Sequence, residues 1–289
     1  MLVAAMTIQA QKKGDINSQY YREIQVGIQD GKYGLLFRSE VIVPYQYDTI
    51  VAQQGNQGFI SQQGGKYGII SVFVLHDGND TGLQLYTNEK RYFFKEQGSN
   101  KKDKDFYLSV LNRPCEYNEI KVIDGKYWVS KEKQKGVLNS VGGIIVHCEY
   151  DEIKVNDGKY WVSKGTQEGV LNSVGGIIVH CEYDKIKVID GKYWVSKGTQ
   201  QGVLNFVGGI IVHCEYDEIK VIDGKYWVSK EKQKGVLNSV GGVILGCEFD
   251  KIELTSDSKY ITYKDKKKSL YNSVGGLIHT DFEVVYSTD

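Results

Sequence analysis

Residues 117–149 read YNEIKVIDGKYWVSKEKQKGVLNSVGGIIVHCE, and this stretch decides the fold because the chain repeats it almost unchanged. Further copies begin at Tyr150, Tyr183 and Tyr216, and a degenerate copy begins at Phe249. A fixed period of about 20 to 50 residues is typical of stacked arrays and propellers, in which each unit buries its apolar face against its neighbours. The sequence therefore predicts a surface built from repeats, and nothing in it names the molecule that binds there.

Each repeat is expected to be a series of short antiparallel strands joined by glycine turns. Asp124-Gly125 is a strong signal for a two-residue hairpin turn, and Val141-Gly142-Gly143 is a second turn. No window of the chain has the sustained 3.6-residue apolar period of a helix. The strands expected in the first copy are 119–123, 127–131, 136–139 and 144–150.

Side-chain alternation along these strands predicts which residues face the core, because successive side chains of a strand point to opposite sides. In the last strand the predicted core face comprises Ile144, Val146, Cys148 and Tyr150. The opposite face comprises Ile145, His147 and Glu149. In the second strand Tyr127 and Val129 take the apolar side, which leaves Trp128 on the other and predicts that its ring is partly exposed.

The predicted fold is all-β: an open array or solenoid of antiparallel β-hairpin repeats with a period of 33 residues. About seven units can be counted. The alternative is a closed β-propeller of about seven blades, in which Phe282–Tyr286 would complete the first unit. An open array is favoured because 33 residues is short against the roughly 40 to 45 of a four-stranded blade.

We expect a single β-repeat domain over residues 15–289, because no linker interrupts it. Its expected parts are divergent repeats at 15–116, four near-identical repeats at 117–248 and a degenerate repeat at 249–289. An open array exposes strand edges at its ends, which need capping to prevent end-to-end association. Asp15–Ile28 and Lys264–Lys268 are the candidate caps, and a monomer is expected.

The first 14 residues resemble the remnant of a secretory signal peptide. Met1–Gln11 contains a short apolar run and a small residue, Ala10, that could precede a cleavage site. This segment predicts a protein that is secreted, periplasmic or on the surface of a bacterium; the alternative is an N-terminus without a targeting role. No run approaches the roughly 20 apolar residues of a membrane span, so none is expected.

Charge and motif content exclude several classes of function. Lys plus Arg and Asp plus Glu both number 36, so the net charge of zero disfavours nucleic acid and anionic bilayers as partners. The sequence lacks the common nucleophile, zinc-protease and phosphate-loop motifs. Asp80-Thr81-Gly82 matches the aspartic protease motif but has no second copy, and a turn is favoured there. We therefore expect a protein that is not an enzyme and holds no cofactor.

Cysteine recurs every 33 residues, at Cys115, Cys148, Cys181, Cys214 and Cys247, and His147, His180 and His213 precede three of these thiols. Equivalent atoms of successive two-stranded units would lie about 10 Å apart or more, whereas zinc ligands lie about 2.0 to 2.3 Å from one ion. Five is also an odd number for a disulfide framework. We interpret the cysteines as small core residues and predict no metal site.

The upstream repeats share a layout that runs from Lys32-Tyr33-Gly34 to Tyr47-Asp48 and begins again at Lys66-Tyr67-Gly68. This layout resembles the WG-repeat family of bacterial β-repeat proteins. By periodicity it extends over about residues 20–289. The central repeats differ, since Lys135, Glu168, Gln201 and Lys234 replace the aromatic residue before glycine. The resemblance implies a β-repeat protein and supplies no catalytic residues.

Two hypotheses for function remain. The first is a non-catalytic scaffold for protein–protein interaction at the cell envelope. The second is binding of a glycan or cell-wall polymer through a ladder of aromatic rings, since such rings combine an apolar face with a polar edge. Its candidate ligand-binding residues are Trp128, Trp161, Trp194, Trp227, Tyr127, Tyr160, Tyr193 and Tyr226. Alternatively these rings fill the contacts between units.

Overall fold

The computed structural model describes residues 6–7, 23–53, 58–76, 89–96 and 104–280. These residues form strands and turns, and none of the described segments is a helix that could cross a membrane. Most of the signal-like segment lies outside the described residues, as do Asp80-Thr81-Gly82 and Phe282–Tyr286. Contacts divide the chain into two compact units, residues 1–153 and 154–289. The single domain expected over residues 15–289 stays a prediction.

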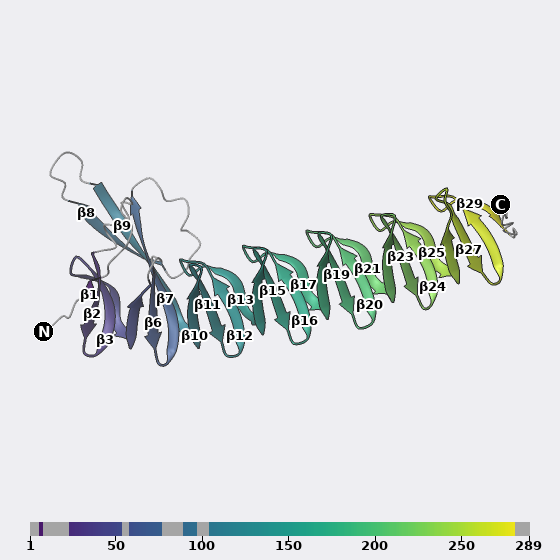
Figure 1. The fold of residues 1–289 in the computed structure, drawn as a ribbon. Coiled ribbons are helices and arrows are strands. Elements are labelled where there is room, and N and C mark those ends of the chain that lie inside the picture. Colours follow the sequence, from purple (N-terminus) through teal and green to yellow (C-terminus); the bar gives the residue numbers. More distant parts are fainter. Residues whose placement is uncertain (1–5, 8–22, 54–57, 77–88, 97–103, 281–289) are drawn as a thin grey trace. The chain divides into compact units, whose positions relative to one another are not determined.

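The first unit contains three antiparallel sheets (Figure 1). The first sheet comprises β1 (Met6–Thr7), β2 (Ile24–Gln29), β3 (Lys32–Phe37) and β4 (Glu40–Tyr47). The second has the order β5-β6-β7-β9-β8, with β5 (Thr49–Ala52), β6 (Gly58–Gln63), β7 (Lys66–His76), β8 (Glu89–Glu96) and β9 (Lys104–Tyr117). The third comprises β10 (Glu119–Ile123), β11 (Lys126–Lys131), β12 (Gln134–Leu138) and β13 (Ile144–Tyr150).

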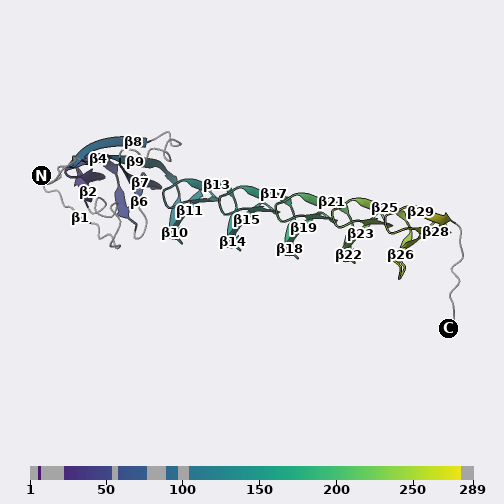
Figure 2. The same cartoon turned by 90° about the horizontal axis from the view of Figure 1, so that it is seen from above.

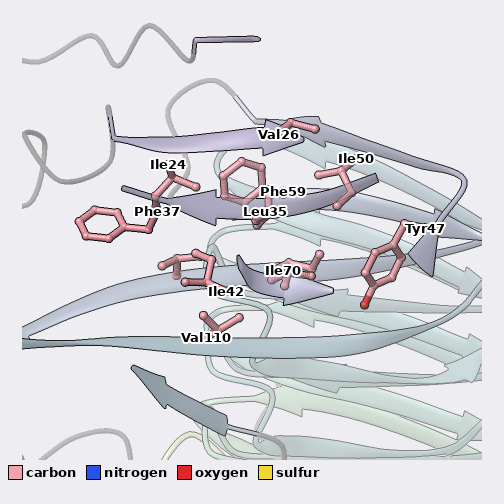
Figure 3. Packing of buried hydrophobic residues seen from close by; sticks show 12 residues of the cluster. Ile24, Val26, Leu35, Phe37, Ile42, Tyr47, Ile50, Phe59, Ile70 and Val110 are labelled. Atoms are coloured by element: carbon pink, nitrogen blue, oxygen red, sulfur yellow. The ribbon is translucent and has the colours of Figure 1, made fainter. Parts of the chain in front are cut away.

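The main core of the first unit lies between its first two sheets. Figure 3 shows Leu35 and Ile42 of the first sheet against Phe59 and Ile70 of the second, all within 1% of complete burial. Burial of each such side chain contributes about 1.5 to 3 kcal/mol. The packed pair of sheets holds β7 and β9 in place, and both strands extend well beyond the length of the other strands in the unit.

The second unit is a row of four-stranded sheets, seen from the side in Figure 1 and from above in Figure 2. The first comprises β14 (Glu152–Asn156), β15 (Lys159–Lys164), β16 (Gln167–Leu171) and β17 (Ile177–Tyr183). The next two are β18 (Lys185–Ile189), β19 (Lys192–Lys197), β20 (Gln200–Leu204) and β21 (Ile210–Tyr216), then β22 (Glu218–Ile222), β23 (Lys225–Lys230), β24 (Gln233–Leu237) and β25 (Val243–Phe249). The last comprises β26 (Lys251–Leu254), β27 (Tyr260–Lys264), β28 (Lys267–Tyr271) and β29 (Leu277–Thr280).

The predicted open array is confirmed. The repeat was expected to be too short for a four-stranded blade, yet each repeat of the second unit does contain a four-stranded sheet. Each sheet of the second unit packs on the next in chain order, and its described strands do not close into a ring. Four strands nevertheless fit into 33 residues, because the strands of the near-identical copies have only five to seven residues. The short turns between them use a two-residue hairpin such as Asp190-Gly191, in which both residues have a positive φ.

Consecutive sheets of the second unit pack face to face. One core cluster joins Val170, Val179 and Tyr183 to Tyr193, Val195 and Leu204 of the following repeat. The next cluster joins Val203 and Val212 to Tyr226, Val228 and Leu237. Each repeat thus buries one face of its sheet against the repeat before it and the other against the repeat after it, which is the arrangement that the period predicts.

A glycine sets the distance between neighbouring repeats. Gly208 has φ +89°. A Cβ atom at this position would lie much closer to the Ile178 carbonyl oxygen of the preceding repeat than 3.0 Å, the distance below which Cβ atoms almost never approach another heavy atom. Ile178 is available for this contact because the pairing of β16 with β17 shifts between Val179 and Ile177, which leaves Ile178 without a direct cross-strand partner. In the two following repeats Gly241 and Gly275 make the same contact, with the carbonyl oxygens of Ile211 and Ile244 in the repeat before their own.

Two polar side chains hold turns at the two ends of this repeat's sheet. The Asn205 Oδ1 atom accepts hydrogen bonds from the backbone N–H groups of Val207 (3.0 Å) and Gly209 (2.8 Å). The Asp184 carboxylate accepts one from the Gly198 N–H group at 2.6 Å. The pair Tyr183-Asp184 therefore combines a core tyrosine with an aspartate that caps the next hairpin turn.

The predicted core face of 144–150 is only partly correct. Val146 and Tyr150 are buried, and Cys148 is half-buried. Ile144 is 43% exposed, whereas Ile145, assigned to the outer face, is half-buried. The reason is a register shift between Val137 and Leu138, which interrupts the strict alternation of side chains at the start of β13.

Candidate binding edge

The predicted aromatic ladder lies mainly between the repeats. All four tyrosines, Tyr127, Tyr160, Tyr193 and Tyr226, are buried. Rings without exposed surface cannot stack on a glycan, so we no longer consider the tyrosines as ligand contacts. The four tryptophans, Trp128, Trp161, Trp194 and Trp227, are half-buried, as expected for rings on the other side of the strand.

In the second unit the tryptophans pack against the following repeat. The Trp161 and Tyr193 rings have centroids 6.4 Å apart at an interplanar angle of 61°, and the Trp227 and Tyr260 rings are 6.0 Å apart at 60°. Trp194 packs on the cluster that contains Tyr226. These edge-on arrangements are favourable for aromatic pairs. The rings therefore fill contacts between repeats, and each tryptophan stays partly exposed.

A lysine beside each of these tryptophans reinforces the contact. Lys159 donates a hydrogen bond to the Tyr193 hydroxyl at 3.0 Å, and Lys225 donates one to the Tyr260 hydroxyl at 2.7 Å. The Lys192 ammonium lies 5.4 Å from the Tyr226 ring centroid, within the range of a cation–π interaction. These lysines act between repeats and are not arranged around an open site.

A different set of residues forms an exposed apolar feature that recurs in every repeat of the second unit. The four turns with the pattern Asn-(Ser/Phe)-Val-Gly-Gly and the starts of the strands that follow them carry apolar side chains into solvent. Their central valines are 62–77% exposed, and the residues three positions later are 56–70% exposed. We call this set the apolar edge; it comprises Val174, Ile177, Phe206, Val207, Ile210, Val240, Val243, Val274, Leu277 and Ile278.

Sequence reasoning missed the apolar edge. By the alternation rule, Ile177 and Ile210 correspond to Ile144 and were assigned to the core, but they lie before the shift in register and are 56% exposed. The signal that could have revealed them is the turn itself. Its two glycines force the flanking apolar residues out of the regular strand, and only the residues beyond the bulge alternate normally.

Several ion pairs lie at the opposite end of the sheets from the apolar edge, although hairpin turns such as Asp190-Gly191 place charged residues at the apolar end as well. The hairpin turn at Gly198-Thr199 and the connection near Asp217 lie at the strand ends away from the turn that starts at Asn205. Exposed ion pairs at this end join Lys197 to Glu182 and, in other repeats, the pairs Lys230–Glu215 and Lys264–Glu248. Such pairs contribute little to stability, and here they mark the strongly hydrated strand ends of each sheet.

In the first unit, the corresponding turn is covered by neighbouring strands of the same chain. Val141, in the turn Asn139–Gly143, is half-buried, whereas its counterparts Val174, Val240 and Val274 are 76–77% exposed. The long strands β7 and β9 reach this turn. The Ser71 hydroxyl donates a hydrogen bond to the Val141 carbonyl at 3.1 Å, and the Arg113 Nε donates one to the Gly142 carbonyl at 2.9 Å. This turn can therefore be bound by β-structure with polar donors.

The cysteines are half-buried and not paired in disulfides. Burial raises the pKa of the Cys115, Cys148, Cys214 and Cys247 thiols, which keeps these groups protonated at neutral pH. They are less buried than core residues should be, because each cysteine lies over the glycine of the neighbouring strand at the edge of its sheet, as Cys181 does over Gly169. Among the residues that the structure describes, His, Cys, Asp and Glu form no metal-ligating group of three.

The fold and the edge define a β-repeat protein, in whose second unit the sheets stack in a row and expose apolar residues at one end. The model of the WG containing repeat matches residues 136–165 and 169–198. The chain thus contains repeats of the WG family, which confirms the resemblance inferred from its layout. No curated protein matches the sequence.

Solved structures with a detectable likeness are remote. They include PorZ, a bacterial surface component of the type-IX secretion system of Porphyromonas gingivalis, with 7% identity and a TM-score of 0.25 over 91% of this chain. The extracellular domain of BT4673 from B. thetaiotaomicron has 11% identity and a TM-score of 0.22 over 96% of the chain, and Kluyveromyces lactis Hsv2 has 10% and 0.22 over 78%. The matches cover 37% of PorZ, 51% of the BT4673 domain and 74% of Hsv2, and no functional argument follows from them.

Proposed function

We propose that the chain is a non-catalytic scaffold for protein–protein interaction at the bacterial cell envelope, and that the apolar edge is its docking surface. The supporting observation is the contrast between two environments of one turn. Protein covers the turn at Val141 in the first unit, whereas the turns at Val174, Val240 and Val274 in the second unit are open. A scaffold that binds through several such turns adds weak contacts along its length.

The chemistry of the open turns fits a protein partner better than a polar ligand. Each turn offers a valine and a further apolar side chain beside backbone amides, which is the mixture of apolar and polar groups found at protein interfaces. The envelope location is part of the proposal and is supported by the signal-like segment Met1–Gln11.

The test places a photo-crosslinking amino acid at one position in living cells. Substitution of Val207, in the apolar edge, is expected to produce crosslinks to protein. The matched control is Thr199, which lies in a turn at the charged end of the same repeat. Crosslinking from Thr199 but not from Val207, or from neither, would contradict the proposed docking surface.

Glycan binding remains the second candidate, supported by the part of each tryptophan that stays exposed. Trp194 lies directly opposite the exposed Lys187 in the neighbouring strand, and Trp227 lies opposite Lys220 in the same way. Against it, the Trp227 Nε1 atom is buried, so its polar edge is turned away from solvent. A shift of tryptophan fluorescence on adding cell-wall polysaccharide, together with strong acrylamide quenching, would favour this candidate. Indoles that resist quenching would exclude it.

A further inference from the structure

The apolar edge carries no formal charge in any of its four segments. Residues 172–179, 205–212, 238–245 and 272–278 contain no Asp, Glu, Lys or Arg, although a quarter of the whole chain is charged. The nearest charges at this end are those of the hairpin turns, where Asp190 and Lys192, for example, occur as a pair of opposite sign. Two identical edges can therefore face each other without repulsion between like charges.

The size of the edge matches that of a protein interface. Its ten side chains, each 49–77% exposed, leave on the order of 1,000 Å² of apolar surface in water. The largest apolar patch of a typical monomer is about 300–600 Å², and a stable interface buries about 800 Å² on each partner. The second unit alone thus exposes enough apolar surface for one standard interface.

We infer that the occupant of the apolar edge is a second copy of this chain, bound edge to edge, in place of the monomer that the sequence analysis expected from capped ends. This inference rests on the proposed function, because it identifies the partner of the same surface. The apolar contacts recur with the spacing of the stacked sheets, about 10 Å, and an identical edge has the same spacing in every repeat. In a two-fold dimer the same patch is used on both copies, so all four turns of one edge meet turns of the other.

The polar groups of the turns also suit this pairing. Ser173, Ser239 and Ser273 are exposed beside the central valines. In the first unit a serine hydroxyl, that of Ser71, binds the carbonyl of the corresponding valine, Val141. Serines of a facing edge supply the same donor to the valine carbonyls of the second unit, so the polar backbone of the turns is not left unsatisfied on pairing.

Phe206 is the expected anchor of the dimer. It replaces the serine found at the same position of the other turns and is 69% exposed, so it contributes nothing to the core of its own repeat. Aromatic side chains that become buried near the centre of an interface dominate its binding energy. The substitution Phe206→Ser restores the residue of the sibling turns, which makes loss of folding an improbable reason for any effect on assembly.

The experiment measures the mass of the full chain by sedimentation and light scattering at about 1 to 100 µM, the range in which interfaces of this size are expected to form. We expect a dimer for the unmodified protein and at least a roughly tenfold weaker dimer for Phe206→Ser. A variant with serine at the four central valines, Val174, Val207, Val240 and Val274, is expected to be monomeric. A control variant at the charged end, Glu231→Gly with Lys232→Thr, copies the sibling turn and should remain dimeric.

Each other outcome counts against a defined part of the proposal. A monomer at every concentration refutes the second copy, but the scaffold function survives if Val207 still crosslinks to another protein in cells. A monomer together with absence of crosslinks refutes both. A dimer that resists the serine substitutions, in variants shown to be folded by circular dichroism, places the interface elsewhere. A monomer that co-sediments with phosphatidylcholine vesicles through the same edge assigns the edge to a lipid surface and also overturns the inference.

Discussion

The contact between Gly208 and the preceding repeat allows a quantitative test of how the sheets are held together. In the substitution Gly208→Ala the new Cβ atom has to adopt φ +89° and meets the backbone carbonyl of Ile178 far inside the distance that Cβ atoms keep. The strained backbone costs about 1 to 3 kcal/mol. The overlap adds a further 1 to 3 kcal/mol or so, because a backbone carbonyl in a paired strand cannot rotate away as a flexible side chain can.

The matched control is Gly191→Ala. Gly191 also has a positive φ, +70°, but nothing lies within 4 Å of its Cβ position. This variant carries the backbone strain without the overlap, so we expect a loss of about 1 to 2 kcal/mol. The difference between the two variants isolates the contact between repeats.

The assay is urea-induced unfolding of both variants, followed by fluorescence and by hydrogen exchange. We expect a clearly lower midpoint for Gly208→Ala than for Gly191→Ala, with faster exchange in β17, whose Ile178 carbonyl has to move. Equal midpoints for the two variants, or undisturbed exchange in β17, would refute the idea that the glycine sets the spacing between repeats.

Four further predictions follow from named contacts. Glu231→Gly should raise the free energy of unfolding by about 0.5 to 1 kcal/mol in urea titrations, because Glu231 has φ +52° where the sibling repeat has glycine; a decrease would contradict this. Asn205→Ala should lower stability by about 1 to 3 kcal/mol, since two backbone N–H groups lose their acceptor; an unchanged thermal midpoint would count against the role given to this turn. Trp194→Ala should cost about 3 to 5 kcal/mol, as expected for a ring packed on the next repeat, whereas a ligand-binding tryptophan would change affinity and leave the urea midpoint in place. Burial raises the pKa of the Cys214 and Cys247 thiols above 9.0, so these thiols ionise at lower pH in the unfolded chain than in the folded one. Their contribution to the free energy of unfolding should be fully present below pH 9 and should be lost as the pH rises through the raised pKa values. A flat profile of urea midpoints from about pH 8 to about pH 11 would contradict this prediction.

The strands could be predicted because several independent signals agree at each repeat. The turn Asp124-Gly125 marks a hairpin by its chemistry, and the flanking alternation marks two strands; both proved correct in β10 and β11. Trp128 was predicted to be partly exposed because it lies on the side of its strand opposite Tyr127 and Val129, and it is half-buried in the structure.

The apolar edge was missed because it depends on where the alternation fails. Ile177 and Val179 are two residues apart, so the alternation rule places them on one face, yet Val179 is 1% exposed and Ile177 is 56% exposed. The register shift at Ile178 separates them. The same shift recurs at the start of β13, β21, β25 and β29, each time after a Gly-Gly turn, so the turn indicates it and the apolar pattern alone does not.

The central claim is that the sheets of the second unit stack face to face in an open row. Its most direct test is a set of distances between spin-label pairs at equivalent turns, in a variant whose cysteines have been replaced by serine. Labels at Thr166 paired with Thr199, Lys232 or Lys266 span one, two or three repeats. We expect the distance to grow by about 10 Å for each added repeat. A distance that levels off or shrinks between two and three repeats would contradict the open row.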